Sequence, residues 1–326
     1  MYRVINIYRA VVSDKLLILM ILLSFLYLKA EADSTNISPA FPVYSQYLQN
    51  GLVINPAYSG TRGALSGFTS YRKQWIGITG TPNLQTLSLH TPFKNDRDAV
   101  GFLAQFMQYG FSKTTSLYGN YAHSIKFEKG RLSMGMKAGL DILNSNFSGI
   151  QTVDPDNVFT ANEDPYIFPN FGAGAYYYSE RIFAGLSVPQ LLSYRKLSSN
   201  STQAYHSFNN YDFIFTGGCL VDINELIKFK PSFLLQYSLD KSKKTKQFDI
   251  SGNFIFADMI WVGGSWRTNE KAIVGIAQIC INQQLMVGLS CDYPLGRMNA
   301  IRNASAEFCL RYEFGTKISA ANPRYF

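Results

Sequence analysis

Residues 248–256 read Phe-Asp-Ile-Ser-Gly-Asn-Phe-Ile-Phe, and this stretch decides the fold class. Apolar or small residues stand at every second position, and Asp249, Ser251 and Asn253 stand between them. Successive side chains of a β-strand point to opposite faces, so the stretch predicts a strand with one apolar and one polar face. Residues 306–314 (Ala-Glu-Phe-Cys-Leu-Arg-Tyr-Glu-Phe) repeat the pattern. We therefore expect a wall that is apolar outside and polar inside.

Similar runs follow one another along most of the chain and predict about fourteen strands, most with the roughly 9–11 residues that a tilted membrane strand needs. They lie near residues 63–75, 83–91, 99–111, 114–126, 131–145, 168–178, 181–188, 210–222, 228–239, 246–256, 259–267, 271–281, 285–292 and 304–314. The sequence thus predicts an all-β fold, a transmembrane antiparallel β-barrel of the bacterial outer membrane.

The lengths of the links between these strands support a membrane barrel. The three longest links, residues 146–167, 189–209 and 293–303, follow the fifth, seventh and thirteenth strands, whereas the links after even-numbered strands are mostly tight. Outer-membrane barrels have short periplasmic turns and longer extracellular loops. With the N-terminus in the periplasm, all three long links fall on the extracellular side.

Composition agrees with this fold class. Of 326 residues, 47% are hydrophobic, 16% are charged and 15% are aromatic, and the mean hydropathy is −0.04. These values are too polar for a bundle of membrane helices and poor in charge for a large soluble domain. The formal net charge of +8 is spread out. One cluster, Lys241, Lys243, Lys244 and Lys246, is typical of a solvated loop, with contact to lipopolysaccharide or an acidic partner as the alternative. Nothing resembles a nucleic-acid module.

The N-terminus is typical of a cleaved signal peptide. Arg3, Arg9 and Lys15 precede an apolar run at residues 16–28, and Ala30-Glu31-Ala32 forms a cleavage site. A membrane anchor is the weaker reading, because a spanning helix needs about 20 apolar residues. We expect export through the inner membrane and four parts. These are a signal peptide at 1–32, a periplasmic or plug segment at 33–55, the barrel at 56–314 and a tail at 315–326.

Small residues inside the predicted strands have structural explanations. Strand-internal glycines, among them Gly135, Gly172 and Gly174, fit tight curvature and close inward packing. The four cysteines have no C-x-x-C spacing and suit small apolar wall positions, although a disulfide between neighbouring strands stays open. They are Cys219, Cys280, Cys291 and Cys309.

Catalytic and metal chemistry are poorly supported. The three histidines are His90, His123 and His206, and His123 adjoins Ser124 within one strand. Adjacent strand residues face opposite sides, so these two cannot act together as base and nucleophile. The loop around 154–164 is rich in oxygen ligands, but its spacing matches no EF-hand, and a solvated rim is the simpler reading. We expect no enzyme activity, no cofactor and no metal site.

Distinctive motifs lie near both ends of the chain. Gln46-Tyr47 precedes residues 51–60, Gly-Leu-Val-Ile-Asn-Pro-Ala-Tyr-Ser-Gly, and the chain closes with Asn-Pro-Arg-Tyr-Phe at 322–326. Between them, residues 71–82 contain Tyr-Arg-Lys-Gln-Trp-Ile-Gly-Ile and Gly-Thr-Pro. Asn before Pro favours a turn, which we expect to open the first strand. We expect Trp75 near a membrane interface and Arg72 to face the lumen.

In order and at both ends, these motifs resemble those of the PorP/SprF family. The family carries a Q-Y…N-P-A-Y-x-G segment, an R-x-Q-W-x-G-I-x-G-x-P segment and a P-R-Y-F end. The middle of this chain resembles the family only in its general pattern of barrel strands. The matching residues are Gln46, Tyr47, Asn55, Pro56, Ala57, Tyr58, Gly60, Arg72, Gln74, Trp75, Ile76, Gly77, Ile78, Gly80, Pro82, Pro323, Arg324, Tyr325 and Phe326.

The resemblance implies an outer-membrane component of the type IX secretion and gliding motility system of the Bacteroidetes. Its partners would be outer-membrane lipid, components of the secretion machinery and the C-terminal domain of a secreted adhesin. Whether it is a core component or the partner of one adhesin stays open. A solute channel with an open lumen and a barrel hydrolase are the alternatives. Tyr and Gln side chains on the inward faces favour a filled lumen over an open one. Residues Pro323–Phe326 follow the last strand and are expected in the periplasm, where they would contact the machinery or act in assembly.

Overall fold

The computed structural model describes residues 42–145, 165–198, 201–206, 208–239, 247–268, 270–295 and 303–315. The predicted signal peptide, the lysine cluster, the oxygen-rich loop and Pro323–Phe326 lie outside these residues. No helix within the described ranges is long and apolar enough to cross a membrane.

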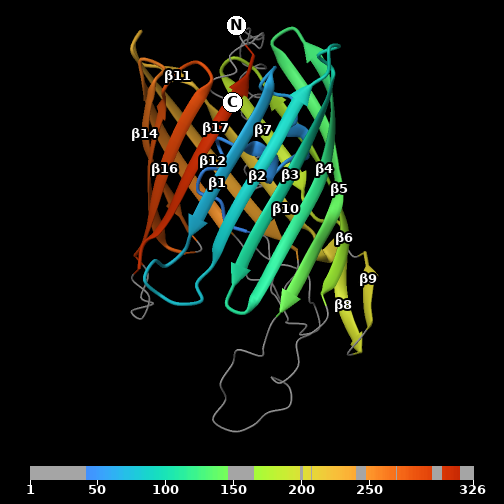
Figure 1. Cartoon of the computed structure of the whole chain (residues 1–326). Helices are drawn as coiled ribbons and strands as arrows, with labels where there is room; N and C mark the ends of the chain where they lie inside the picture. The colour runs from blue at the N-terminus through green and yellow to red at the C-terminus, as the bar shows by residue number, and fades with distance from the viewer. Residues whose placement is uncertain are drawn as a thin grey trace, which may run out of the picture.

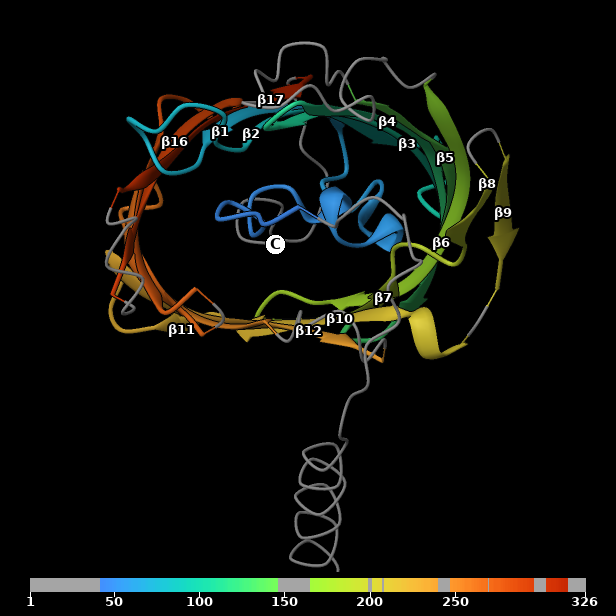
Figure 2. The same cartoon turned by 90° about the horizontal axis from the view of Figure 1, so that it is seen from below.

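Fourteen antiparallel strands close into a barrel, as predicted (Figures 1 and 2). The ring closes where β1 pairs with β17 and where β10 pairs with β12, while the short β11 (Val221–Asp222) continues β10 along β12. The wall strands are β1 (Leu65–Lys73), β2 (Asn83–Pro92), β3 (Asp98–Tyr109), β4 (Ser112–Phe127), β5 (Gly130–Ser145), β6 (Tyr166–Tyr178), β7 (Ile182–Val188), β10 (Asp212–Cys219), β12 (Ile227–Ser238), β13 (Gln247–Phe256), β14 (Ile260–Arg267), β15 (Ala272–Cys280), β16 (Leu285–Pro294) and β17 (Ser305–Phe314).

The two faces of the wall differ as the alternation predicts. In β13, Phe248, Ile250 and Phe254 are exposed on the outside, whereas Asp249 and Ser251 are buried on the inside. The same alternation of exposed apolar and buried polar residues runs along β17. An outer face of this kind suits lipid, and the polar inner face needs partners within the lumen.

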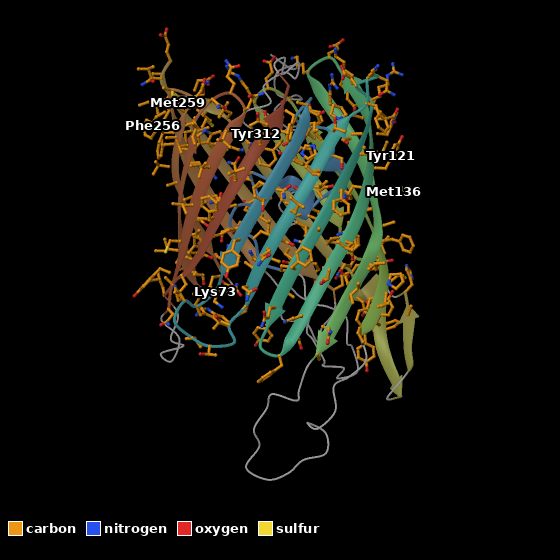
Figure 3. All side chains as sticks on the ribbon, viewed as in Figure 1. Lys73, Tyr121, Met136, Phe256, Met259 and Tyr312 are labelled. Atoms are coloured by element: carbon orange, nitrogen blue, oxygen red, sulfur yellow. The ribbon has the colours of Figure 1, made fainter. Side chains whose placement is uncertain are left out.

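The two ends of the barrel carry links of different length (Figure 1). At one end, which we call the short-link end, the described links are 93–97, 128–129, 179–181, 223–226, 257–259 and 281–284. At the opposite, long-link end they include 74–82, 189–211 and the segment between β16 and β17. Figure 1 shows the short-link end at the top and Figure 3 places Lys73 at the lower, long-link end.

The link between β7 and β10 contains structure that the sequence pattern missed. Within the predicted loop at 189–209, β8 (Ser193–Ser198) and β9 (Ser201–Tyr205) form a separate two-stranded sheet outside the wall (Figure 2). A 3-10 helix, η4 (Phe208–Asn210), follows it. Neither strand joins the barrel, so neither shows the alternation between lipid and lumen by which wall strands are recognised.

The start of the same link covers an edge of the barrel wall. β7 pairs only with Ala173–Tyr178 of β6, so the first half of β6 extends beyond its neighbour. There the Asn170 side chain accepts hydrogen bonds from Leu191 N and Leu192 N, at 3.1 and 3.0 Å, and donates to Leu192 O at 3.0 Å. Leu191 N also donates to Phe171 O. Such capping protects a strand edge that would otherwise present unpaired backbone groups.

Candidate functional site

The lumen of the barrel contains the first described part of the chain. Residues 42–63, here called the lumen segment, run inside the wall and include the 3-10 helices η1 (Gly51–Val53) and η2 (Pro56–Tyr58) (Figure 2). Most of its side chains are buried, polar ones included. The described part of the predicted segment at 33–55 therefore lies in the lumen, and the chain reaches the wall only at Leu65.

The lumen segment spans the length of the barrel. Ser45 lies beside Arg72 and Asp292, near the ends of β1 and β16 that face the long-link end. Gly60 lies beside His90, near the end of β2 that faces the short-link end. The segment thus runs from the long-link half of the lumen to the short-link end, where it turns into β1.

A cluster of buried charges holds the start of the lumen segment. Ser45 Oγ donates to Asp292 at 3.0 Å and accepts hydrogen bonds from Arg72 Nη1 at 2.8 Å and Arg267 Nη2 at 3.1 Å. Arg72 Nη2 and Arg267 Nη1 both contact Asp292 Oδ2, at 2.6 and 2.8 Å. Ser45 N donates to Glu307 Oε2 at 3.0 Å. We call these five residues the charge cluster. Buried charges are tolerated when paired in this way.

Glutamines continue the contact toward the middle of the lumen. Gln278 Nε2 donates to Gln46 Oε1 at 2.6 Å, and Gln49 Nε2 donates to Gln278 Oε1 at 2.7 Å. Arg311 Nη1 then donates to Gln49 Oε1 at 2.5 Å. The motif residue Gln46 is thus linked through Gln278 to the wall, while its own Nε2 atom is buried and has no hydrogen-bond partner within the described residues.

Two tyrosines of the lumen segment are fully enclosed. Gln105 Nε2 donates to the Tyr44 hydroxyl at 2.5 Å, and Tyr47 packs in the same apolar cluster. The aromatic rings fill the lumen without adding charge to it.

The Asn-Pro motif forms a tight turn against three wall strands. Asn55 Oδ1 accepts a hydrogen bond from Ala57 N at 3.0 Å and so caps η2, which Pro56 opens. Asn55 Nδ2 donates to Ala175 O at 2.9 Å, which ties the turn to β6. A Cβ at Gly135 would overlap the backbone of Pro56 and Ala57. Close inward packing was predicted for this glycine, and the absence of a side chain at Gly135 leaves the space that the turn occupies.

The motif ends where the lumen segment turns into the wall. Gly60 has φ of +76° and donates its N–H to His90 Nδ1 at 3.1 Å. The Tyr58 ring packs edge-on against His90, with centroids 5.5 Å apart, and its hydroxyl accepts a hydrogen bond from Arg62 Nε at 2.9 Å. His90 is buried and acts as a hydrogen-bond acceptor for the turn, which is a structural role.

The second motif forms a hydrogen-bonded loop at the other end of the barrel. Residues 74–82, here called the rim loop, connect β1 to β2 at the long-link end. Trp75 has φ of 47° and Gly77 has φ of 95°. Trp75 N donates to Ser305 Oγ at 3.2 Å, and Asn303 Nδ2 donates to Ile76 O at 2.6 Å. The half-buried Trp75 is thus fixed at the rim, and the side chain of Ile76 is exposed.

The structure therefore divides the predicted site residues that it describes, which do not include Pro323–Phe326, into two groups. Gln46 to Gly60 meet the wall inside the lumen, where Arg72 joins them as predicted, whereas Gln74 to Pro82 lie in the rim loop. Sequence reasoning missed the wall partners of the lumen segment. Their signal was a charged or amide residue on the inner face of an alternating strand, and the missed residues are Arg267, Gln278, Asp292, Glu307 and Arg311.

The histidines do not form a catalytic arrangement. His123 Nδ1 lies 2.8 Å from Asp98 Oδ1 on the outer surface, while Ser124 Oγ donates to Arg97 O at 3.1 Å. His206 bonds to the Tyr211 hydroxyl. No group of three or more His, Cys, Asp or Glu side chains in the described part of the chain is arranged to hold a metal ion. None of the four cysteines, all of which lie in the described ranges, forms a disulfide bond there.

Comparisons with known proteins give one family and several structures. The sequence model of a family described as "Type IX secretion system membrane protein PorP/SprF" matches residues 38–312. None of the curated proteins matches the chain. Among solved structures, Omp33 of Acinetobacter baumannii is 10% identical, with a TM-score of 0.44 over 77% of this chain and 96% of that chain. The toluene transporter TbuX of Ralstonia pickettii is also 10% identical, with a TM-score of 0.46 over 89% of this chain and 100% of that chain.

Proposed function

The chain belongs to the PorP/SprF family of type IX secretion system membrane proteins, and from this premise we propose how it works. It is an outer-membrane β-barrel. We propose that it is a non-catalytic component that assists the secretion or the surface attachment of a partner protein such as an adhesin. In this proposal the short-link end lies in the periplasm, beside other components of the machinery, and the long-link end faces the partner outside.

The filled lumen is the observation that carries this proposal. The lumen segment is anchored by hydrogen bonds to Arg72, Asp292 and Glu307 near one end and to Ala175 and His90 farther along. A barrel occupied in this way by its own chain is a poor conduit for solutes. It is instead a stable body that presents loops on both sides of the membrane, which suits a protein that works by contact.

A clean deletion in the native bacterium tests the secretion role. Intact cells of the deletion strain and of a complemented strain are treated with protease, and the released surface peptides are compared by mass spectrometry. We expect one or a few surface proteins to disappear from the deletion strain and to return on complementation. An unchanged set of surface proteins would contradict the proposal.

A solute channel is the second candidate, and the polar inner face of the wall is the observation that favours it. Purified protein reconstituted in planar bilayers separates the two functions. We expect no steady ion conductance, because the lumen segment and its charge cluster occupy the lumen. Long-lived conductance steps from the unmodified protein would favour the channel.

A further inference from the structure

A groove opens at the short-link end of the barrel, between the links 93–97, 128–129 and 179–181. Its volume is about 540 Å³, and Gly60 and Gly63 of the lumen segment also line it. We call it the mouth groove. Figure 1 shows the ends of β4 and β5, which the link 128–129 joins, at this end of the barrel. Because the lumen segment lies inside the wall, the groove opens from the mouth of the barrel and not from its lipid-facing side.

Two cations lie directly opposite each other in this groove. Lys126 of β4 is in register with Arg131 of β5, which is in register with Tyr178 of β6, and all three residues line the groove. Tyr121 and Met136, at the alternate positions of β4 and β5, are exposed on the outer surface (Figure 3). Successive strand side chains point to opposite faces, so Lys126 and Arg131 point inward. We call these two residues the cation pair.

The described part of the chain supplies no carboxylate partner for the cation pair. Arg131 Nη1 donates to the backbone oxygen of Asp96 at 2.9 Å, and among the described residues neither Lys126 nor Arg131 forms an ion pair. By contrast Arg181, which also lines the groove, pairs with Asp222 at 3.0 Å. Like charges directly opposite each other on one face of a sheet repel. An anion bound between them removes this repulsion and gains charge-assisted hydrogen bonds.

The other charges of the groove determine which kind of anion it accepts. Asp96, Glu128 and Glu180 line it as well, together with a further cation, Lys129. These carboxylates repel a densely charged polyanion, because such a ligand cannot keep all of its charges away from them. A segment with one or two carboxylates among uncharged residues can place its charge at the cation pair alone. The groove thus favours a short acidic sequence over polyphosphate or a polyacidic chain.

The position of the cation pair indicates a ligand that arrives from the aqueous side. Lipid headgroups surround the outer face of the wall, whereas Lys126 and Arg131 lie on its inner face, in a groove that the lumen segment also lines. A headgroup would have to leave the bilayer to reach them. The volume of about 540 Å³ is within the range of about 300–1,000 Å³ for sites that enclose a drug-sized ligand. A few residues of an extended peptide have this size.

We propose that the mouth groove binds an acidic segment of a soluble periplasmic protein, with one carboxylate held between Lys126 and Arg131 and accepting a hydrogen bond from the Tyr178 hydroxyl. The periplasmic location of the partner rests on the proposed function, which places the short-link end beside the secretion machinery. Binding of the segment itself depends only on the groove. An unchanged surface in the deletion strain and a failed binding experiment would therefore contradict different proposals.

Two synthetic peptides test this assignment on the purified full chain in detergent. The peptide Gly-Ser-Glu-Glu-Ser-Gly carries two carboxylates, and Gly-Ser-Gln-Gln-Ser-Gly has nearly the same shape without them. Both are amidated at the C-terminus and carry an uncharged dye, so that fluorescence anisotropy measures their affinities. We expect saturable binding of the Glu peptide that is at least about tenfold tighter than that of the Gln peptide and that weakens as salt is added.

Substitutions test whether the peptide binds at the cation pair. Lys126→Gln and Arg131→Gln should each lower the affinity for the Glu peptide about tenfold and leave the affinity for the Gln peptide unchanged, because only the charged contact is lost. Lys113→Gln, at the opposite end of β4, is the matched control and should change neither affinity. The proposal is overturned by equal affinities for the two peptides or by an equal loss in Lys113→Gln. It is also overturned if glycerol phosphate displaces the Glu peptide at equal concentration, which would identify a site for lipid headgroups.

Discussion

Ser45 is a small residue with an unusual number of charged neighbours. Its hydroxyl and backbone N–H together contact two guanidinium groups and two carboxylates of the charge cluster. The four charges come from β1, at the start of the wall, and from β14, β16 and β17, near its end. The lumen segment therefore joins strands on both sides of the closing pair β1–β17.

Asp292 is the member of this cluster whose loss should cost most. Asp292→Asn leaves Arg72 and Arg267 buried against one fewer charge, and we expect destabilisation of about 3–5 kcal/mol. The midpoint of urea unfolding in detergent, followed by tryptophan fluorescence, measures this change. Asp222→Asn, which removes the carboxylate of an exposed ion pair with Arg181, is the matched control and should change stability by less than about 1 kcal/mol.

A substitution at Gly135 tests whether the lumen segment closes the lumen, because this residue contacts the segment by shape and not by charge. A Gly135→Val side chain would occupy the space of Pro56 and Ala57 and should displace the Asn-Pro turn. We expect the variant to conduct ions in planar bilayers and to lose protection of residues 42–63 from protease. Gly119→Ala is the control, because the nearest atom to a Cβ there is Ala138 O at 3.9 Å. Conductance equal in both variants would show that the turn does not close the lumen.

Only part of this site could be predicted from the sequence. The inward direction of Arg72 follows from alternation along one strand, and the turn at Asn55-Pro56 follows from local backbone preferences. The partners of Arg72 do not follow, since Asp292 lies 220 positions away and is one of several polar residues on inner faces. Which of them meet depends on closure of the whole barrel.

At the level of elements, the rim loop owes its shape to a few hydrogen bonds and to backbone strain. Asn303→Ala removes the bond to Ile76 O, and we expect a loss of about 1 kcal/mol that is confined to the loop. Hydrogen exchange of residues 76–80 should rise, while exchange in β1 and β2 should stay as it is. An unchanged exchange rate in the loop would mean that its other contacts hold the loop without the bond from Asn303 to Ile76 O.

The wall strands were predicted within a few residues because each has one face toward lipid and one toward a polar lumen. Their bounds differ from the predicted ranges by no more than one residue at the short links and by two residues at several strand ends that face the long-link end. Leu220 divides the predicted strand 210–222 into β10 and β11. β8 and β9 escaped prediction because they pair only with each other. Without two contrasting environments, their side chains have no reason to alternate.

At the level of the whole molecule, the orientation in the membrane is the property to test. The proposal places the rim loop outside the cell and the link 128–129 in the periplasm. A Thr79→Cys variant should react with a membrane-impermeant maleimide on intact cells. A Glu128→Cys variant should react only after the outer membrane is permeabilised. If only the Glu128→Cys variant were labelled on intact cells, the barrel would have the opposite orientation in the membrane. The native Cys291, which is exposed, requires that labelling be assigned by peptide mapping.

The bonds from Ser45 to Glu307 and from Gln49 to Arg311 each join residues separated by 262 positions in the sequence. The lumen segment is synthesised before any wall strand, yet its partners on β16 and β17 are among the last to be made. Once Asn55 bonds to β6, the lumen segment can act as a template that aligns β16 and β17 before β1 pairs with β17. Contacts this distant make folding slow. We therefore expect closure of β1 on β17 to depend on a piece of chain that lies inside the lumen and never touches lipid.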